Sequence, residues 1–117
     1  MFSKMLMTAI VAALMTLPAA AEQRTAKIST RGDVAIVLSQ FKGPIDKVTF
    51  GVKDNNVLCS NVTAQFADGG SQSLFYGELK AGTPREVQLK KNSVEKLVFT
   101  CHTQAQQGSV LELTTAP

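Results

Sequence analysis

The stretch Val94–Thr103, with the sequence VEKLVFTCHT, shows the period-two alternation of a β-strand that has one buried face. Side chains on a strand point alternately to its two faces, so Leu97, Phe99 and Cys101 share one face and His102 lies on the other. Because large apolar residues belong in a core, we expect Cys101 to point inward and His102 outward. The only histidine of the chain then faces away from the cysteine beside it, which disfavours a shared metal or catalytic site.

Short apolar runs alternate with turn residues along the rest of the chain, and the turn ADGG at residues 67–70 is a strong hairpin signal. No apolar set recurs with the helical period. The strands are expected within residues 34–41, 45–52, 57–66, 71–76, 85–89, 94–101 and 109–115. Seven or eight strands at this spacing predict an all-β fold, a single antiparallel β-sandwich over residues 32–117, with a small β-barrel as the alternative.

One expected strand changes parity in its middle. Val57 and Cys59 share one face of a regular strand, whereas the apolar residues from Val62 to Phe66 share the other. Both sets can face one core only if an extra residue is inserted between them. We therefore expect a bulge or a break at residues 60–61.

The first 21 residues have the order of a secretory signal peptide. Lys4 is followed by the uncharged segment 5–17, a proline and the small residues 19–21, so cleavage is expected between Ala21 and Glu22. The uncharged segment is too short to span a membrane as a helix, and no integral membrane segment is expected after cleavage. The pattern is typical of a bacterial protein that is periplasmic or secreted. Residues 22–31 form a polar segment, either a tail or an edge strand near residues 27–29.

The two cysteines are expected to form a disulfide. Cys59 follows Val57 into the interior by the same parity argument that places Cys101 there. Two inward cysteines in a small exported domain most simply pair with each other. The prediction is a structural Cys59–Cys101 bridge.

The composition disfavours several kinds of chemistry. All four methionines lie within residues 1–21, and one histidine with two cysteines is too small a ligand set for a copper or structural zinc site. No catalytic residue, metal site or cofactor is therefore predicted. Carboxylate pairs such as Asp33 with Asp46, or Asp54 with Asp68, stay open. The net charge is only +3 and the basic residues form no long run, so no nucleic-acid partner is expected.

Aromatic residues offer little for stacking on sugars. The chain has no tryptophan and one tyrosine, and the phenylalanines fall mainly in strand patterns that a small core would consume. Since Phe75 and Tyr76 are consecutive, one of them faces away from the core. Tyr76 is the aromatic residue that we expect to be exposed.

The order of these elements resembles a family of small exported bacterial proteins of unknown function, the YaaI-like group. The resemblance covers about residues 32–113 and rests on GDVAIVL, IDKVTFGV, NVTAQFADGGSQSL, AGTPREVQL, VEKLVFTCHT and the late GSVLEL. It implies a β-sandwich in the bacterial envelope. The family has no established activity, so the resemblance assigns no functional residue.

The sequence thus favours a non-enzymatic β-sandwich that acts as a binding or accessory module of the cell envelope. Its partner would be a protein or another envelope ligand. The alternative function is inhibition of an exported or foreign hydrolase, such as a lysozyme or protease, by a rigid loop at Glu78–Arg85. If residues 34–41 lie at a sheet edge, pairing of that edge with another chain becomes plausible.

Overall fold

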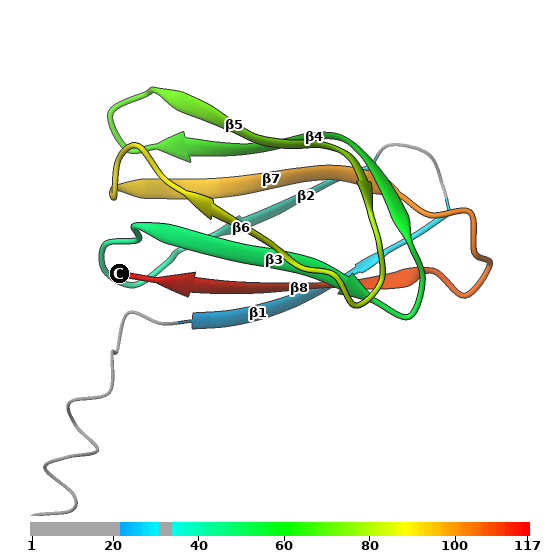
Figure 1. The fold of residues 1–117 in the computed structure, drawn as a ribbon. Coiled ribbons are helices and arrows are strands. Elements are labelled where there is room, and N and C mark those ends of the chain that lie inside the picture. Colours follow the sequence, from blue (N-terminus) through cyan, green and yellow to red (C-terminus); the bar gives the residue numbers. More distant parts are fainter. Residues whose placement is uncertain (1–21, 31–33) are drawn as a thin grey trace, which may run out of the picture.

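The structure is a computed structural model that describes residues 22–30 and 34–117. The predicted signal peptide, which ends at Ala21, lies outside the described residues. The described residues form strands and loops without a helix (Figure 1). The strands are β1 (Glu22–Ile28), β2 (Val34–Ser39), β3 (Lys47–Lys53), β4 (Val57–Phe66), β5 (Ser71–Leu79), β6 (Arg85–Gln88), β7 (Val94–His102) and β8 (Ser109–Ala116). The described part of the chain contains no apolar helix of membrane-spanning length.

The eight strands form two antiparallel sheets that face each other (Figure 1). One sheet has the order β1-β8-β3-β6 and the other the order β2-β7-β4-β5. The antiparallel pairs include β1 with β8, β2 with β7, β3 with β6 and β4 with β5. A long hairpin wound around two sheets gives this nested pairing, which is the jelly-roll form of the β-sandwich. The predicted sandwich is confirmed, and because the sheets stay separate the barrel alternative is wrong.

The core lies between the inward faces of the two sheets. Leu97, Phe99 and Cys101 of β7 are buried, as the parity of VEKLVFTCHT predicts. The ring of Phe99 packs edge-on against the ring of Phe50 from the opposite sheet, with the ring centres 5.5 Å apart. This contact joins the middle of β7 to the middle of β3 and is the kind of geometry that aromatic pairs favour.

The expected bulge in β4 is confirmed. The register of β4 with both neighbouring strands shifts just after Cys59. The shift allows Val57 and Cys59 before it, and Val62 and Ala64 after it, all to be buried against one core. A regular strand would have turned one of these two sets to solvent.

The N-terminal polar segment contains more strand than the sequence suggested. Residues 22–28 form β1, which pairs with β8 along its whole length, so the sandwich includes this segment and does not begin at residue 32. The segment is polar because it is a sheet edge whose inward side chains are only partly buried until Ile28. Arg24 fixes β1 to the opposite sheet by donating hydrogen bonds to the carbonyl oxygens of Ser39 and Gln40, at 3.1 and 3.2 Å.

Candidate functional site

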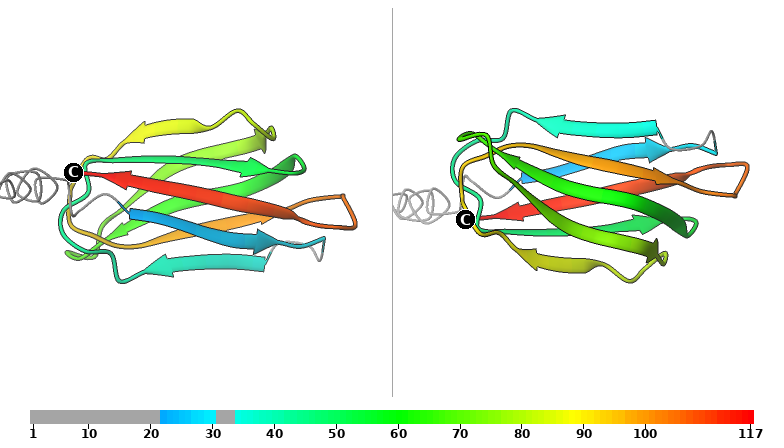
Figure 2. Two further views of the ribbon diagram at one scale, coloured as in Figure 1. Left: turned by 90° about the horizontal axis from the view of Figure 1, so that it is seen from below. Right: turned by 90° about the horizontal axis from the view of Figure 1, so that it is seen from above.

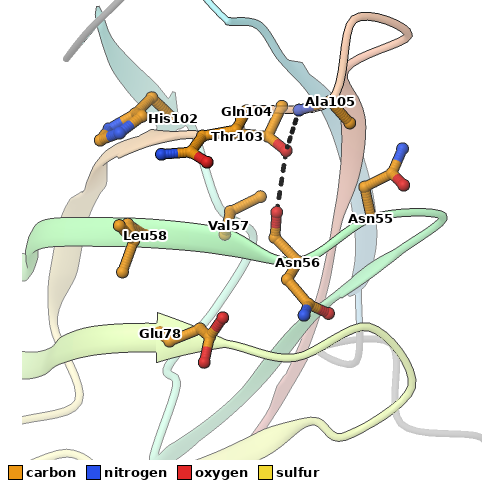
Figure 3. A pocket seen from close by; sticks show the side chains of 9 residues that line it. All are labelled: Asn55, Asn56, Val57, Leu58, Glu78, His102, Thr103, Gln104 and Ala105. Atoms are coloured by element: carbon orange, nitrogen blue, oxygen red, sulfur yellow. Dashed lines mark hydrogen bonds between the residues drawn. The ribbon is translucent and has the colours of Figure 1, made fainter.

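A hollow of about 300 Å³ opens at one end of the β2-β7-β4-β5 sheet (Figure 3). Its walls come from the β3–β4 turn, the start of β4, the end of β5 and the end of β7 with the loop that follows. The lining residues are Asn55, Asn56, Val57, Leu58, Glu78, His102, Thr103, Gln104 and Ala105.

The strand register places three of these side chains in one row across the outer face of the sheet. Leu58 of β4 is paired with His102 of β7 on one side and with Glu78 of β5 on the other. Neighbouring strands lie about 4.8 Å apart, so the backbones of Glu78 and His102 are separated by about 10 Å. Leu58 is 45% exposed between them and forms an apolar floor with a carboxylate and an imidazole on either side.

The rim of the hollow is held by hydrogen bonds between loops. The buried Thr103 hydroxyl donates to the carbonyl oxygen of Asn56 at 2.8 Å and accepts from the amide of Ala105 at 3.3 Å (Figure 3). The amide of Thr103 also donates to the carbonyl oxygen of Ser29. One side chain thus ties the loop after β7 to the β3–β4 turn.

A second set of contacts reinforces the same end of the sandwich. The Asn55 side-chain amide donates to the carbonyl oxygen of Gly108 at 2.7 Å. The buried Ser109 hydroxyl lies 2.9 Å from the Lys53 carbonyl oxygen and 2.6 Å from that of Asn55. These polar groups of the turn are engaged within the protein, so they act as supports of the hollow.

The β5–β6 loop is exposed but anchored. The amide of Ala81 donates to Oδ1 of Asn56 at 2.8 Å, and the amide of Gly82 donates to the carbonyl oxygen of Val52 at 3.1 Å. Within the loop the Thr83 amide donates to the Lys80 carbonyl oxygen. All residues from Lys80 to Glu86 are nevertheless exposed. The loop that the sequence analysis named as a possible inhibitory element is therefore held by hydrogen bonds to β3 and to the β3–β4 turn.

Tyr76 extends the outer face beside the hollow. It precedes Glu78 by two residues on β5 and is 80% exposed, whereas its neighbour Phe75 packs against the core ring of Phe50. The expectation that Tyr76 is the outward aromatic is confirmed. Together with Leu58 it gives this end of the sheet two exposed apolar groups, next to a carboxylate and the Gln104 amide.

The two cysteines form a buried disulfide between neighbouring strands. Cys59 and Cys101 face each other directly across β4 and β7, form a disulfide with an S–S distance of 2.01 Å, and are both 2% exposed. The predicted bridge is confirmed. Because both sulfurs are bonded to each other, no thiolate stands beside His102, which lies on the outer face as the parity argument expects.

Of the two carboxylate pairs suggested by the sequence, only Asp54 with Asp68 lies within the described residues, and these two side chains do not come together. Asp54 and Asp68 lie in the turns at opposite ends of β4, which is ten residues and therefore about 30 Å long. Asp68 holds its hairpin turn: it accepts from the amide of Gly70 and pairs with Lys91, and the hydrogen bond from Lys91 lowers the pKa of the Asp68 carboxyl. Asp33 lies outside the described residues. The described ranges contain no cluster of three or more histidine, cysteine or acidic side chains fit for a metal.

The sequence did not point to Leu58 or Gln104 as site residues, and it named Glu78 only as the first residue of the loop Glu78–Arg85. One signal was available: Leu58 is a large apolar residue on the outward face of β4, between the inward Val57 and Cys59. Its exposure marks the face, but only the register shows that Glu78 and His102 flank it.

Comparisons with known proteins give distant likeness only. No protein-family model and no curated protein matches the chain. The crystal structure of the Yersinia pseudotuberculosis-derived mitogen is similar with a TM-score of 0.47 and 9% identity, over 82% of this chain and 84% of that one. The structure of the infectious bursal disease virus Gx strain is similar with a TM-score of 0.44 and 18% identity, over 81% of this chain and 31% of that one. Likeness at this level assigns the chain to no family.

Proposed function

We propose that this protein is an exported, non-enzymatic binding module of the bacterial envelope, of the kind that the YaaI-like resemblance implies. The disulfide supports an oxidising compartment, because such bonds persist in the periplasm and outside the cell. The signal-peptide pattern of residues 1–21 supports export.

The observation that carries the proposal is the hollow around Leu58. The groups that support the hollow are already hydrogen-bonded to one another, so the site is formed before a ligand arrives. Binding there therefore loses little conformational entropy. The Glu78 carboxylate accepts hydrogen bonds, the Gln104 amide both donates and accepts, and Leu58 offers apolar contact. Such a set suits a polar ligand with donor groups and a small apolar patch, such as a peptide segment or an envelope glycan.

A capture experiment tests the site. The processed protein is immobilised and exposed to a soluble envelope extract, and the retained components are compared between wild type and Leu58→Glu. Gln65→Glu is the matched control, because it adds the same charge to the outer part of the same strand but far from the hollow. We expect a component of the extract that wild type and Gln65→Glu retain and that Leu58→Glu does not retain. Equal retention by all three proteins would contradict a site at Leu58.

Enzymatic turnover would contradict the proposal in a different way. A hydrolytic activity of the purified protein that a single change, such as Glu78→Gln or His102→Ala, abolishes would make the same hollow an active site. Folding of each variant is checked by circular dichroism, so that loss of structure is not mistaken for loss of function.

The anchored loop favours the second candidate function, inhibition of a hydrolase. An exposed loop that is fixed at several points loses little entropy when it enters a cleft. A panel of lysozymes and proteases, assayed with wild type and with Thr83→Arg in the loop, tests it. Inhibition by wild type that Thr83→Arg removes would support this function, and no inhibition across the panel would count against it.

A further inference from the structure

Four strands form the edges of the two sheets: β1 and β6 in one sheet, β2 and β5 in the other. Figure 2 shows β2 at one margin of the molecule and β6 at the opposite margin, both from below and from above. Within residues 22–30 and 34–117, no strand lies beyond β2 in either view. The backbone groups along an edge are unpaired on one side, so an exposed edge is a ready template for another strand.

Three of the four edges carry features that discourage pairing with another chain. β1 bears charged residues, including Arg24 and Lys27. β6 has only four residues, two of which are Arg85 and Glu86. β5 is irregular, because its register with β4 shifts and its Gly77 has a φ of 132°. Charge, shortness and bulges are the usual protections of sheet edges.

The β2 edge has none of these protections. Its sequence is VAIVLS, which contains no charge, glycine or proline and is rich in β-branched residues. It pairs with β7 in an unbroken register over all six residues. Val37 at its centre is 53% exposed, although Ile36 and Leu38 on either side pack against the core. A regular and uncharged edge is therefore presented at the margin of the described part of the molecule.

One end of this edge is already occupied from within the chain. The Arg24 guanidinium donates to the carbonyl oxygen of Ser39, and it is held in place by an ion pair with Glu22 at 3.1 Å. The open part of the edge is thus limited to residues 34–38. This limits the partner to a short strand and fixes where its pairing must end.

We propose that β2 pairs antiparallel with β2 of a second copy of this chain. An uncharged strand is best matched by another uncharged strand, because apolar side chains beside Val37 cover its exposed surface and charged side chains do not. The chain itself supplies such a strand, and two-fold symmetry keeps like faces together, inner with inner and outer with outer. The result is one continuous sheet of eight strands with two β2 strands at its centre.

The pairing has a consequence for the binding hollow. A two-fold axis normal to the sheet leaves both outer faces on the same side of the dimer. The two β4 strands are then five strand spacings apart, so two copies of Leu58 are separated sideways by about 24 Å. The dimer presents two hollows to one surface and gains avidity for a repeating ligand. This consequence rests on the proposed function, whereas the pairing of β2 does not.

Sedimentation analysis of the full processed protein over a wide concentration range tests the pairing without any ligand. A short edge makes a small interface, so we expect a weak dimer with a Kd on the order of 0.1 mM. When residues 34–38 pair with residues 38–34 of the second copy, Val37→Lys places two lysines diagonally across the paired strands, about 7–8 Å apart on the same face, and should raise the Kd about tenfold or more. Val37→Thr keeps the branched shape without charge and should stay within about threefold of wild type. An equal mixture of Val37→Lys and Val37→Glu should associate again as a heterodimer.

Two outcomes would overturn the pairing of β2 with a second copy. A wild-type protein that stays monomeric up to millimolar concentration excludes the pairing of two β2 strands. The β2 edge would then pair with a strand of another protein or stay unpaired. A dimer that persists in Val37→Lys but is lost in Leu58→Glu would place the interface on the sheet face. Because Val37 points to solvent, both charged variants should fold, and circular dichroism establishes this before sedimentation.

Discussion

Breaking the Cys59–Cys101 bond is expected to remove a large share of the stability of the sandwich. The bond joins residues 42 positions apart, and in the chain-entropy model a loop of this size raises the free energy of the unfolded chain by about 4 kcal/mol at 25 °C. A domain of this size has a free energy of unfolding of about 5–15 kcal/mol. Since β4 and β7 are also joined by their own ladder, reduction should leave the folded sheets in place and act mainly on the unfolded chain.

Urea unfolding with and without a reducing agent measures this effect. Far-ultraviolet circular dichroism is the appropriate signal, because the chain has no tryptophan. With an m value of about 1–2 kcal/mol per M, a loss of about 4 kcal/mol lowers the midpoint by about 2–4 M urea. The double variant Cys59→Ala/Cys101→Ala should resemble the reduced protein and should not respond to the reductant. A shift of the wild-type midpoint below about 0.5 M would refute the loop-closure reasoning.

Three further predictions concern the core, the β1 edge and one turn. Phe99→Ala removes a fully buried ring and should lower the free energy of unfolding by about 3–5 kcal/mol, measured in the same urea assay. The hydrogen bond from the Lys42 amide lowers the pKa of the Glu22 carboxyl. The ionised carboxylate therefore stabilises the folded protein fully at pH values above the ordinary glutamate pKa of about 4.3. This stabilisation is lost as the pH falls through the lower pKa of the folded state. Glu22→Gln should therefore lower the melting temperature at pH 7 and flatten its decline in acid; an identical pH profile would contradict this role. Gly108 has a φ of 78°, and an added Cβ would lie 2.7 Å from the carbonyl oxygen of Ile28. Gly108→Ala should lower the free energy of unfolding by more than about 1 kcal/mol. An unchanged melting temperature would show that the loop adapts to the added methyl group.

The sequence predicted those features that depend on local alternation. The inward face of β7, the parity change in β4 and the outward Tyr76 all follow from the order of apolar and polar residues along one strand, and the structure confirms each of them. The Cys59–Cys101 pairing also followed, because both cysteines were assigned to the same interior. Each of these predictions needed only the direction in which a side chain points.

The sequence could not predict which strands lie next to each other. The nested order of the two sheets brings β1 beside β8 and β2 beside β7, and no local pattern encodes pairing over such separations. The hollow depends on this order, because Glu78, Leu58 and His102 belong to three different strands. The start of β1 was missed for a related reason: an edge strand with partly buried side chains has the composition of a polar tail.

We propose that the chain is processed and exported with its Cys59–Cys101 bond formed, and intact mass spectrometry of the protein recovered from the cells that produce it measures both properties. The sample is treated with a thiol-alkylating reagent before and after reduction. The expected chain starts at Glu22, takes up no label in its oxidised form and takes up two labels after reduction, at Cys59 and Cys101. A chain that keeps residues 1–21 would contradict the proposed export, and a folded chain whose thiols are labelled without reduction would contradict the disulfide.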